Sequence, residues 1–235
     1  MRIRLLFLFV PLFWLHSVCA QAQSVSPQEW LNVRGTELLK VLAEPEATKR
    51  FSNTLRLADN VFNAKELARL ALGRYWIEFS DEQKAHYSDL FLKYFVVTYA
   101  SSRLPLDSVS FTIGDAVPSG KDVLVKTVVG WSGDTGELQN EITGTSSQNV
   151  DSGIELVFAL RKTGDGYYIR DFQLAGKSVL LFLRGKLERM FVGSDYSPDK
   201  MIADMEKTVQ TKITNAETMD RMNKMKERRN SSAAP

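Results

Sequence analysis

The chain has 235 residues, of which 44% are hydrophobic and 25% are charged, with 30 Lys and Arg residues against 28 Asp and Glu residues. This near balance gives no strong positive field, so the composition argues against a nucleic-acid-binding protein, which needs clustered basic charge. One cysteine and two histidines exclude an intrachain disulfide and a metal site built from several Cys or His ligands.

The first 22 residues have the layout of a secretory signal peptide. Two arginines precede an apolar run from residue 5 to residue 15, and small residues follow it. The run is shorter than the roughly 20 residues that a transmembrane helix needs, so we expect cleavage and no stable membrane anchor. Cleavage after Ala20 or Ala22 leaves a mature chain with 28 basic and 28 acidic residues, no cysteine, and His86 as its single histidine.

Helical sequence follows the signal peptide. The stretch from residue 26 to residue 62 has helical character and is interrupted near Pro45. A further helix is predicted from residue 64 to about residue 79, because Asn63 with Glu66 three residues later is typical of a helix N-terminus.

A glycine lies within this second helical run. Gly73 precedes Tyr75 and Trp76, although glycine inside a helix costs about 1 kcal/mol relative to alanine. We interpret it as a position where a neighbouring element packs closely. Ser80 with Gln83 is a second capping signature, and the helix after it is apolar over most of its circumference, which predicts cover on more than one side.

From residue 108 the apolar period changes to two, which predicts strands. Strands are predicted at 109–113, 123–131, 154–161 and from 167, and the polar strip at 137–153 is interpreted as a weak edge strand with a loop. Short strands joined by turns indicate an antiparallel sheet, and helices at both ends of the chain indicate the α+β class.

Two C-terminal helices complete the predicted domain, at about 176–192 and 198–213. We find no linker and no repeat, so residues 23–213 are predicted to form a single domain. Residues 214–235 are rich in charge, and we expect a helical extension or a disordered tail there.

Two blocks of the chain carry the motifs of a known family. The first block comprises Leu72, Gly73, Tyr75, Trp76, Gln83, Phe91, Thr98, Tyr99 and Ala100. The second comprises Ala159, Leu160, Arg161, Gly166, Asp171, Gly176, Lys177, Ser178, Val179 and Arg184. Over roughly residues 30–210 the sequence resembles the MlaC, or toluene-tolerance, family of periplasmic lipid carriers. Tyr167, Leu183 and Leu187 depart from the aromatic residues usual in that family.

The resemblance implies a curved antiparallel sheet of the nuclear-transport-factor-2-like kind, packed with N- and C-terminal helices around an apolar cavity. The cavity would hold the acyl chains of a phospholipid cargo and leave the headgroup at its mouth, without cofactor, metal or catalytic residue. Such a carrier moves lipid through the periplasm between an outer-membrane lipoprotein complex and an inner-membrane ABC transporter, and so maintains outer-membrane lipid asymmetry. A polycyclic cargo such as a hopanoid is an alternative, because a subgroup of the family is associated with hopanoid-producing bacteria.

Twelve side chains are candidates for the lipid-binding wall. They are Leu72, Tyr75, Phe91, Phe95, Tyr99, Val125, Val129, Leu156, Phe158, Phe172, Leu180 and Leu183. Arg161 and Arg184 are weaker candidates for contact with the headgroup phosphate.

Two functions of other classes stay open. A small enzyme on the same fold would place an acid and a base in the cavity, with Asp171 and Tyr168 or Tyr99 as its candidate pair. The alternative role of Asp171 is to accept a hydrogen bond from a neighbouring backbone N–H. An adaptor would bind a transporter complex and carry nothing. The balanced charge argues against strong attraction to anionic membranes, so we expect transfer to depend on partner proteins.

Overall fold

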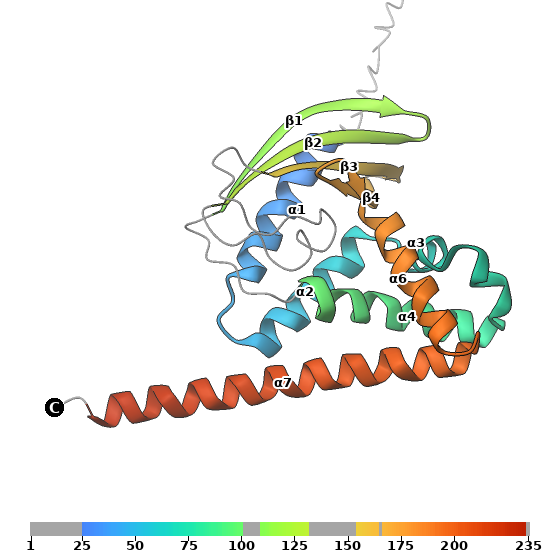
Figure 1. The fold of residues 1–235 in the computed structure, drawn as a ribbon. Helices are drawn as coiled ribbons and strands as arrows, with labels where there is room; N and C mark the ends of the chain where they lie inside the picture. The colour runs from blue at the N-terminus through green and yellow to red at the C-terminus, as the bar shows by residue number, and fades with distance from the viewer. Residues whose placement is uncertain (1–24, 101–108, 132–153, 165, 234–235) are drawn as a thin grey trace, which may run out of the picture.

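The computed structural model of the chain describes residues 25–100, 109–131, 154–164 and 166–233. A curved antiparallel sheet forms one layer, and the helices lie beneath it (Figure 1). The predicted α+β class is therefore confirmed.

The N-terminal half is helical, and its boundaries follow local signals. Its elements are α1 (Pro27–Leu42), α2 (Ala47–Val61), α3 (Ala64–Leu72), the 3-10 helix η1 (Gly73–Glu78), α4 (Asp81–Phe95) and the π-helix η2 (Val96–Ala100). The first interruption falls around Pro45, as predicted. Asn63 Oδ1 accepts a hydrogen bond from the Glu66 N–H at 3.0 Å, and Ser80 and Gln83 form both hydrogen bonds of a capping box.

The prediction of one helix from residue 64 to about residue 79, with Gly73 inside it, is wrong. α3 ends at Leu72, and Gly73 turns the backbone at φ +62° and ψ −127°, a conformation that favours glycine. A Cβ atom on Gly73 would lie 3.1 Å from Nε of Arg184. Arg184 Nε and Nη2 donate hydrogen bonds to the Leu70 carbonyl at 3.0 and 2.7 Å, which satisfies one of the carbonyls exposed at the end of α3.

Within the described residues the sheet has five strands in chain order, each antiparallel to the next. They are β1 (Val109–Ser119), β2 (Asp122–Trp131), β3 (Ile154–Thr163), β4 (Gly166–Leu174) and β5 (Lys177–Ser178). Irregularities in the β1–β2 and β3–β4 registers break the regular pairing, and such bulges bend strands. The weak edge strand predicted within 137–153 lies outside the described residues.

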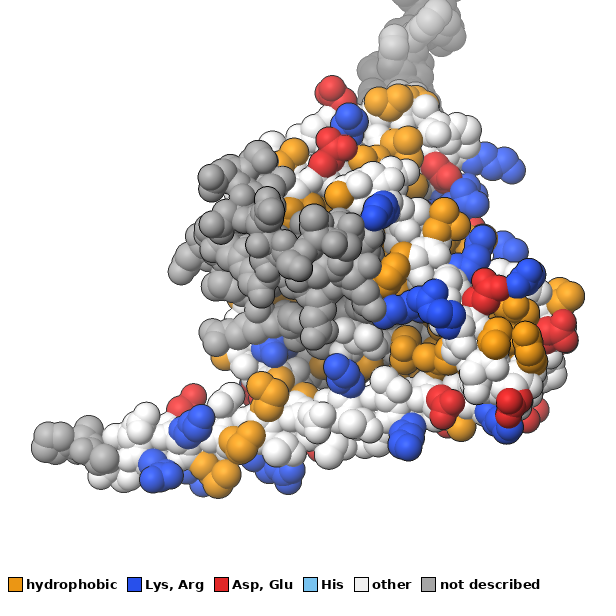
Figure 2. Space-filling view, in the orientation of Figure 1, with side chains coloured by type: hydrophobic (Ala, Val, Ile, Leu, Met, Phe, Trp, Pro, Cys, Tyr) orange, Lys and Arg blue, Asp and Glu red, His pale blue; other side chains and the backbone are white. Residues whose placement is uncertain are grey.

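Two long helices follow the sheet, α6 (Val179–Gly193) and α7 (Pro198–Ala233). α7 runs as one helix through residues 198–233, and its C-terminal end projects past the body of the protein (Figure 1). Hydrophobic side chains alternate with Lys and Arg along this projecting end (Figure 2), where Met219, Met222 and Met225 are about half exposed.

The buried apolar residues of the described part of the chain form two cores. The larger one lies among α3, α4, α6 and α7, and includes the fully buried Tyr87, Phe91 and Phe191. Burial raises the pKa of the Tyr87 hydroxyl. The smaller core joins α1 to the sheet around Trp30 and Leu160. Between these cores the apolar surfaces of α1, α2 and the sheet enclose unfilled space.

Candidate functional site

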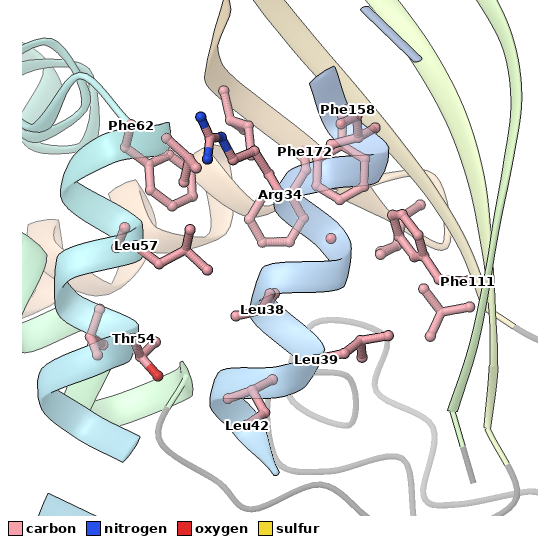
Figure 3. A pocket seen from close by; sticks show the side chains of 18 of the residues that line it. Arg34, Leu38, Leu39, Leu42, Thr54, Leu57, Phe62, Phe111, Phe158 and Phe172 are labelled. Atoms are coloured by element: carbon pink, nitrogen blue, oxygen red, sulfur yellow. The ribbon is translucent and has the colours of Figure 1, made fainter. Parts of the chain in front are cut away.

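A cavity of about 290 Å³ lies between α1, α2 and the sheet (Figure 3). Its wall also includes Phe62, which follows α2, and residues at the junction of α4 and η2. Apart from Arg34 and Thr54, its described lining consists of apolar side chains and Gly35. Protein interiors are close-packed, so an apolar space of this size is unusual and indicates a binding site for an apolar ligand.

α1 supplies a continuous face of this cavity. Its lining residues are Leu31, Arg34, Gly35, Leu38, Leu39 and Leu42. They recur three or four residues apart, which places them on one side of the helix. α2 supplies the facing wall through Leu57 and its neighbours (Figure 3). The cavity therefore exists because α1 and α2 are separated from each other where they face the sheet.

A glycine lets the sheet approach α1 closely. A Cβ atom on Gly35 would lie 2.5 Å from Cε1 of Phe111, so the ring of this β1 residue packs directly on the backbone of α1. The same ring lines the cavity. Gly35 thus permits close packing inside a helix, whereas the close neighbour of Gly73 is the Arg184 side chain of α6 at the end of α3.

Cross-strand pairs build the sheet side of the cavity. Phe111 of β1 lies opposite Val129 of β2, and Phe158 of β3 lies opposite Phe172 of β4. The two phenylalanine rings stack with centroids 5.8 Å apart. Leu156 lies two residues before Phe158 on β3 and also contributes to the wall.

The two polar lining residues differ in their bonding. The Thr54 hydroxyl donates to the carbonyl of Arg50 at 2.8 Å, which satisfies it within α2. Arg34 Nη1 donates to Oε2 of Glu37 at 2.8 Å, and its guanidinium carbon lies 5.9 Å from the centroid of the Trp30 ring. Nε of Arg34 is buried and has no hydrogen-bond partner among the described residues.

The structure brings five of the twelve predicted wall residues together on the cavity. These are Phe95, Val129, Leu156, Phe158 and Phe172. Leu180 and Leu183 line a separate small pocket of about 10 Å³ that shares Phe95 and Phe172 with the main cavity.

The other predicted wall residues lie elsewhere. Leu72 and Phe91 are buried in the helical core, and Val125 is buried in the smaller core on the same face of the sheet as its cross-strand partner Phe158. Tyr75 packs against Phe191 with ring centroids 5.0 Å apart. The Tyr99 side chain lies outside the described part of the structure.

The two arginines predicted to meet a headgroup have partners within the protein. Arg161 Nε donates to Asp122 at 2.5 Å, and Arg170 Nη1 donates to the other oxygen of the same carboxylate at 2.9 Å. Burial alone would raise the pKa of Asp122, but its two arginine partners outweigh burial and lower that pKa. Arg184 binds the end of α3, as described above. Neither Arg161 nor Arg184 lines the cavity.

Of the two pairs considered for an enzyme, Asp171 with Tyr168 is not assembled, and the Tyr99 side chain of the other lies outside the described part of the structure. Asp171 accepts hydrogen bonds from the Phe172 and Leu180 backbone N–H groups at 2.8 and 3.0 Å and from the Ser178 hydroxyl at 2.6 Å. The Tyr168 hydroxyl donates instead to Glu66 at 2.5 Å. Asp171 therefore holds the turn from β4 into α6, which is its alternative, structural role.

The residues missed by sequence reasoning are mainly those of α1 and α2, together with Phe62, Val96, Phe111 and Ile169. The leucines of α1 recur at helical spacing, and this signal was available in the sequence. It does not separate a face that packs against a neighbour from a face that borders a cavity. The family motifs also begin after these two helices.

None of the helices in the described part of the chain is long and apolar enough to cross a membrane. No group of three or more His, Cys, Asp or Glu side chains among these residues is placed to hold a metal ion.

Comparison with known proteins identifies the family. The family model described as MlaC protein matches residues 35–207. The chain belongs to the MlaC family. The matched range begins within α1 and ends within α7, so it contains most of the cavity wall, while the C-terminal part of α7 lies beyond it.

A solved structure shares the fold of this MlaC-family chain. It is the phospholipid-binding protein from Ralstonia solanacearum in complex with a phospholipid, with a TM-score of 0.59 and 14% sequence identity. The alignment covers 80% of this chain and 99% of that protein. No curated protein matches the chain significantly.

Proposed function

We propose that this protein is a periplasmic phospholipid carrier that shelters acyl chain in the cavity between α1, α2 and the sheet. The observation that carries the proposal is the apolar cavity of about 290 Å³. Membership of the MlaC family and the fold shared with a phospholipid-binding protein support it.

The energetics of lipid transfer explain why such a cavity is sufficient for function. Each methylene group removed from water contributes roughly 0.8 kcal/mol, so an acyl chain with about 14 buried methylenes costs on the order of 11 kcal/mol to expose. A carrier must supply apolar contacts that replace those of the bilayer. It needs neither an acid–base pair nor a metal for this purpose.

The size of the cavity limits how the lipid is held. An apolar protein cavity of about 150 Å³ takes up benzene, so a cavity of twice that size has room for roughly a dozen carbon atoms. A diacyl lipid is larger. We therefore propose that α1 moves away from α2 and the sheet on loading, or that part of one chain remains outside the cavity.

The route of the lipid is part of the same proposal. A signal peptide ending at Ala20 or Ala22 would deliver the protein to the periplasm. An outer-membrane lipoprotein complex and an inner-membrane ABC transporter would be its partners, and maintenance of outer-membrane lipid asymmetry would be the outcome. These elements rest on membership of the MlaC family.

Native mass spectrometry of the purified protein tests the proposal. We expect one phospholipid per protein in the wild type. Leu39→Trp fills part of the cavity and should reduce lipid occupancy severalfold, whereas Val33→Trp places the same ring at a 48%-exposed position of α1 and should leave occupancy unchanged. Circular dichroism of both variants checks that they fold.

Several outcomes would contradict the carrier proposal. A wild-type protein that stays empty when offered phospholipid, but binds a membrane complex, would favour the adaptor. Turnover of a small substrate by the empty protein would favour an enzyme. A bound polycyclic lipid would retain the cavity as the binding site and replace the phospholipid as cargo.

A further inference from the structure

Arg34 is the charged residue among those that line the cavity in the described structure. Its position on α1 places it one turn from Leu31 and Leu38, which also line the cavity (Figure 3). A charged group on an otherwise apolar wall is costly unless something compensates it. Its bonding therefore indicates what the cavity accommodates.

The guanidinium of Arg34 is only partly satisfied within the protein. Nη1 pairs with Glu37 at 2.8 Å, while the buried Nε has no hydrogen-bond partner among the described residues. A guanidinium carries five N–H donors in a planar fork, and oxyanions such as phosphate and carboxylate match this fork with two acceptors at once. Nε is buried, so an acceptor from outside the chain meets the exposed part of the guanidinium first and reaches Nε only when the side chain turns.

Arg34 lies where the cavity meets solvent. Its side chain is 34% exposed and Leu38 is 37% exposed, whereas Leu31 on the preceding turn is 2% exposed. An amphiphile with its tail among the leucines and phenylalanines would bring its polar head to this opening. The aliphatic part of Arg34 can border the tail while its charged end stays near water.

We propose that Arg34 binds the phosphate of the bound lipid, and that Glu37 is the intramolecular partner with which the phosphate competes. This inference rests on the proposed function and adds the recognition of an anionic head at the cavity mouth. Arg161 and Arg184 are less suited to the role, because Asp122 and the Leu70 carbonyl already engage them away from the cavity.

The test compares two lipids with identical tails. The delipidated mature protein is offered dioleoyl phosphatidylglycerol or dioleoylglycerol from cyclodextrin, and the bound fraction is measured by native mass spectrometry. Arg34→Gln should weaken binding of the phospholipid about tenfold, as expected for loss of a charge-assisted hydrogen bond, and leave binding of dioleoylglycerol unchanged. Arg34→Lys keeps the charge without the fork and should retain part of the preference.

Two further variants separate the proposed contact from general effects of charge. Glu37→Gln removes the competing carboxylate and should strengthen phospholipid binding severalfold. Lys40→Gln makes the same charge change as Arg34→Gln at an exposed position of α1 and should have no effect.

The outcomes distinguish this inference from the carrier proposal. If the wild type binds both lipids and Arg34→Gln weakens the binding of both equally or not at all, the proposed role of Arg34 is refuted. The carrier proposal then remains valid. If the wild type binds neither lipid, both proposals fail. Leu39→Trp should weaken the binding of both lipids equally, because the larger side chain occupies space that either acyl tail would fill.

Discussion

The side chain of Asp220 fastens the C-terminal half of α7 to the start of α2, and its removal should destabilise the fold. Its two carboxylate oxygens accept hydrogen bonds from the Ala47 and Thr48 backbone N–H groups at 2.7 and 2.9 Å, and the Thr48 hydroxyl donates a third at 2.7 Å. Glu46 occupies the N-cap position of α2, but its side chain accepts no capping hydrogen bond. Asp220 therefore caps α2 from a distant helix.

The structure sets the size of the expected loss. Removing a helix N-cap costs roughly 0.5–2 kcal/mol, and a buried donor left without a partner costs roughly 1–3 kcal/mol. Asp220 is 6% exposed, so water replaces it poorly. We expect Asp220→Ala to lower the free energy of unfolding by about 2 kcal/mol, which for a protein of this size lowers Tm by about 4–8 °C.

The stability lost on replacing Asp220 should decrease at low pH. Burial alone would raise the pKa of Asp220, but the hydrogen bonds from Thr48 and Ala47 outweigh it and hold that pKa below its ordinary value. The folded state thus favours the carboxylate, and its stabilisation is complete above the unfolded pKa of about 3.9. It is lost as the pH falls through the lower, folded pKa.

Urea unfolding followed by circular dichroism measures this effect. Asp220→Asn should be less stable than the wild type at pH 7, and the difference should shrink below pH 4, where the carboxyl is protonated first in the unfolded state and then, at lower pH, in the folded state. Glu217→Gln removes an exposed acid one turn earlier and serves as the control. Unchanged stability of Asp220→Ala at pH 7, or an Asn effect of the same size at pH 3, would refute the reasoning.

Two further predictions concern stability and are also measured by urea unfolding. Gly73→Ala should cost about 1–3 kcal/mol, because it forces a side chain into a positive φ and against Arg184. Gly120→Ala, at φ +61° with open space around it, should cost about 1 kcal/mol, and equal losses in the two variants would rule out the steric contribution of Arg184. Asp122→Asn should destabilise the protein above pH 4, and this loss should diminish as the pH falls from the unfolded pKa toward the lower, folded pKa, because the stabilisation is lost on protonation. A loss that persists unchanged at low pH would show that the charge on Asp122 is unimportant for its pairing with Arg161.

Local chemistry explains which parts of the fold were predictable. Asn63 with Glu66 and Ser80 with Gln83 begin helices where the sequence predicts them, because a cap needs only residues within one turn. Alternating apolar residues identified the strands because this pattern also depends only on nearby residues. Short turns between the strands made antiparallel pairing the simplest arrangement.

The two glycines show where local reasoning stops. The sequence raised the cost of a helix glycine at Gly73 alone, yet the structure gives Gly35 and Gly73 different roles. Gly73 ends a helix at positive φ, whereas Gly35 remains inside α1 and lets the ring of Phe111 approach. The second role depends on a strand more than 70 residues away in the sequence, and so does not follow from the neighbours of Gly35.

The sequence by itself determined most of the elements, their order and the α+β class, although it joined α3 and η1 into one helix. The tertiary structure decided which apolar side chains surround empty space. Phe91 and Phe95 lie one turn apart on α4, yet Phe91 packs against Tyr87 in the core and Phe95 borders the cavity. Both are equally hydrophobic, and burial in either place satisfies the same driving force. The difference depends on how far α1 and α2 stand from the sheet, and this spacing is set by contacts between distant parts of the chain.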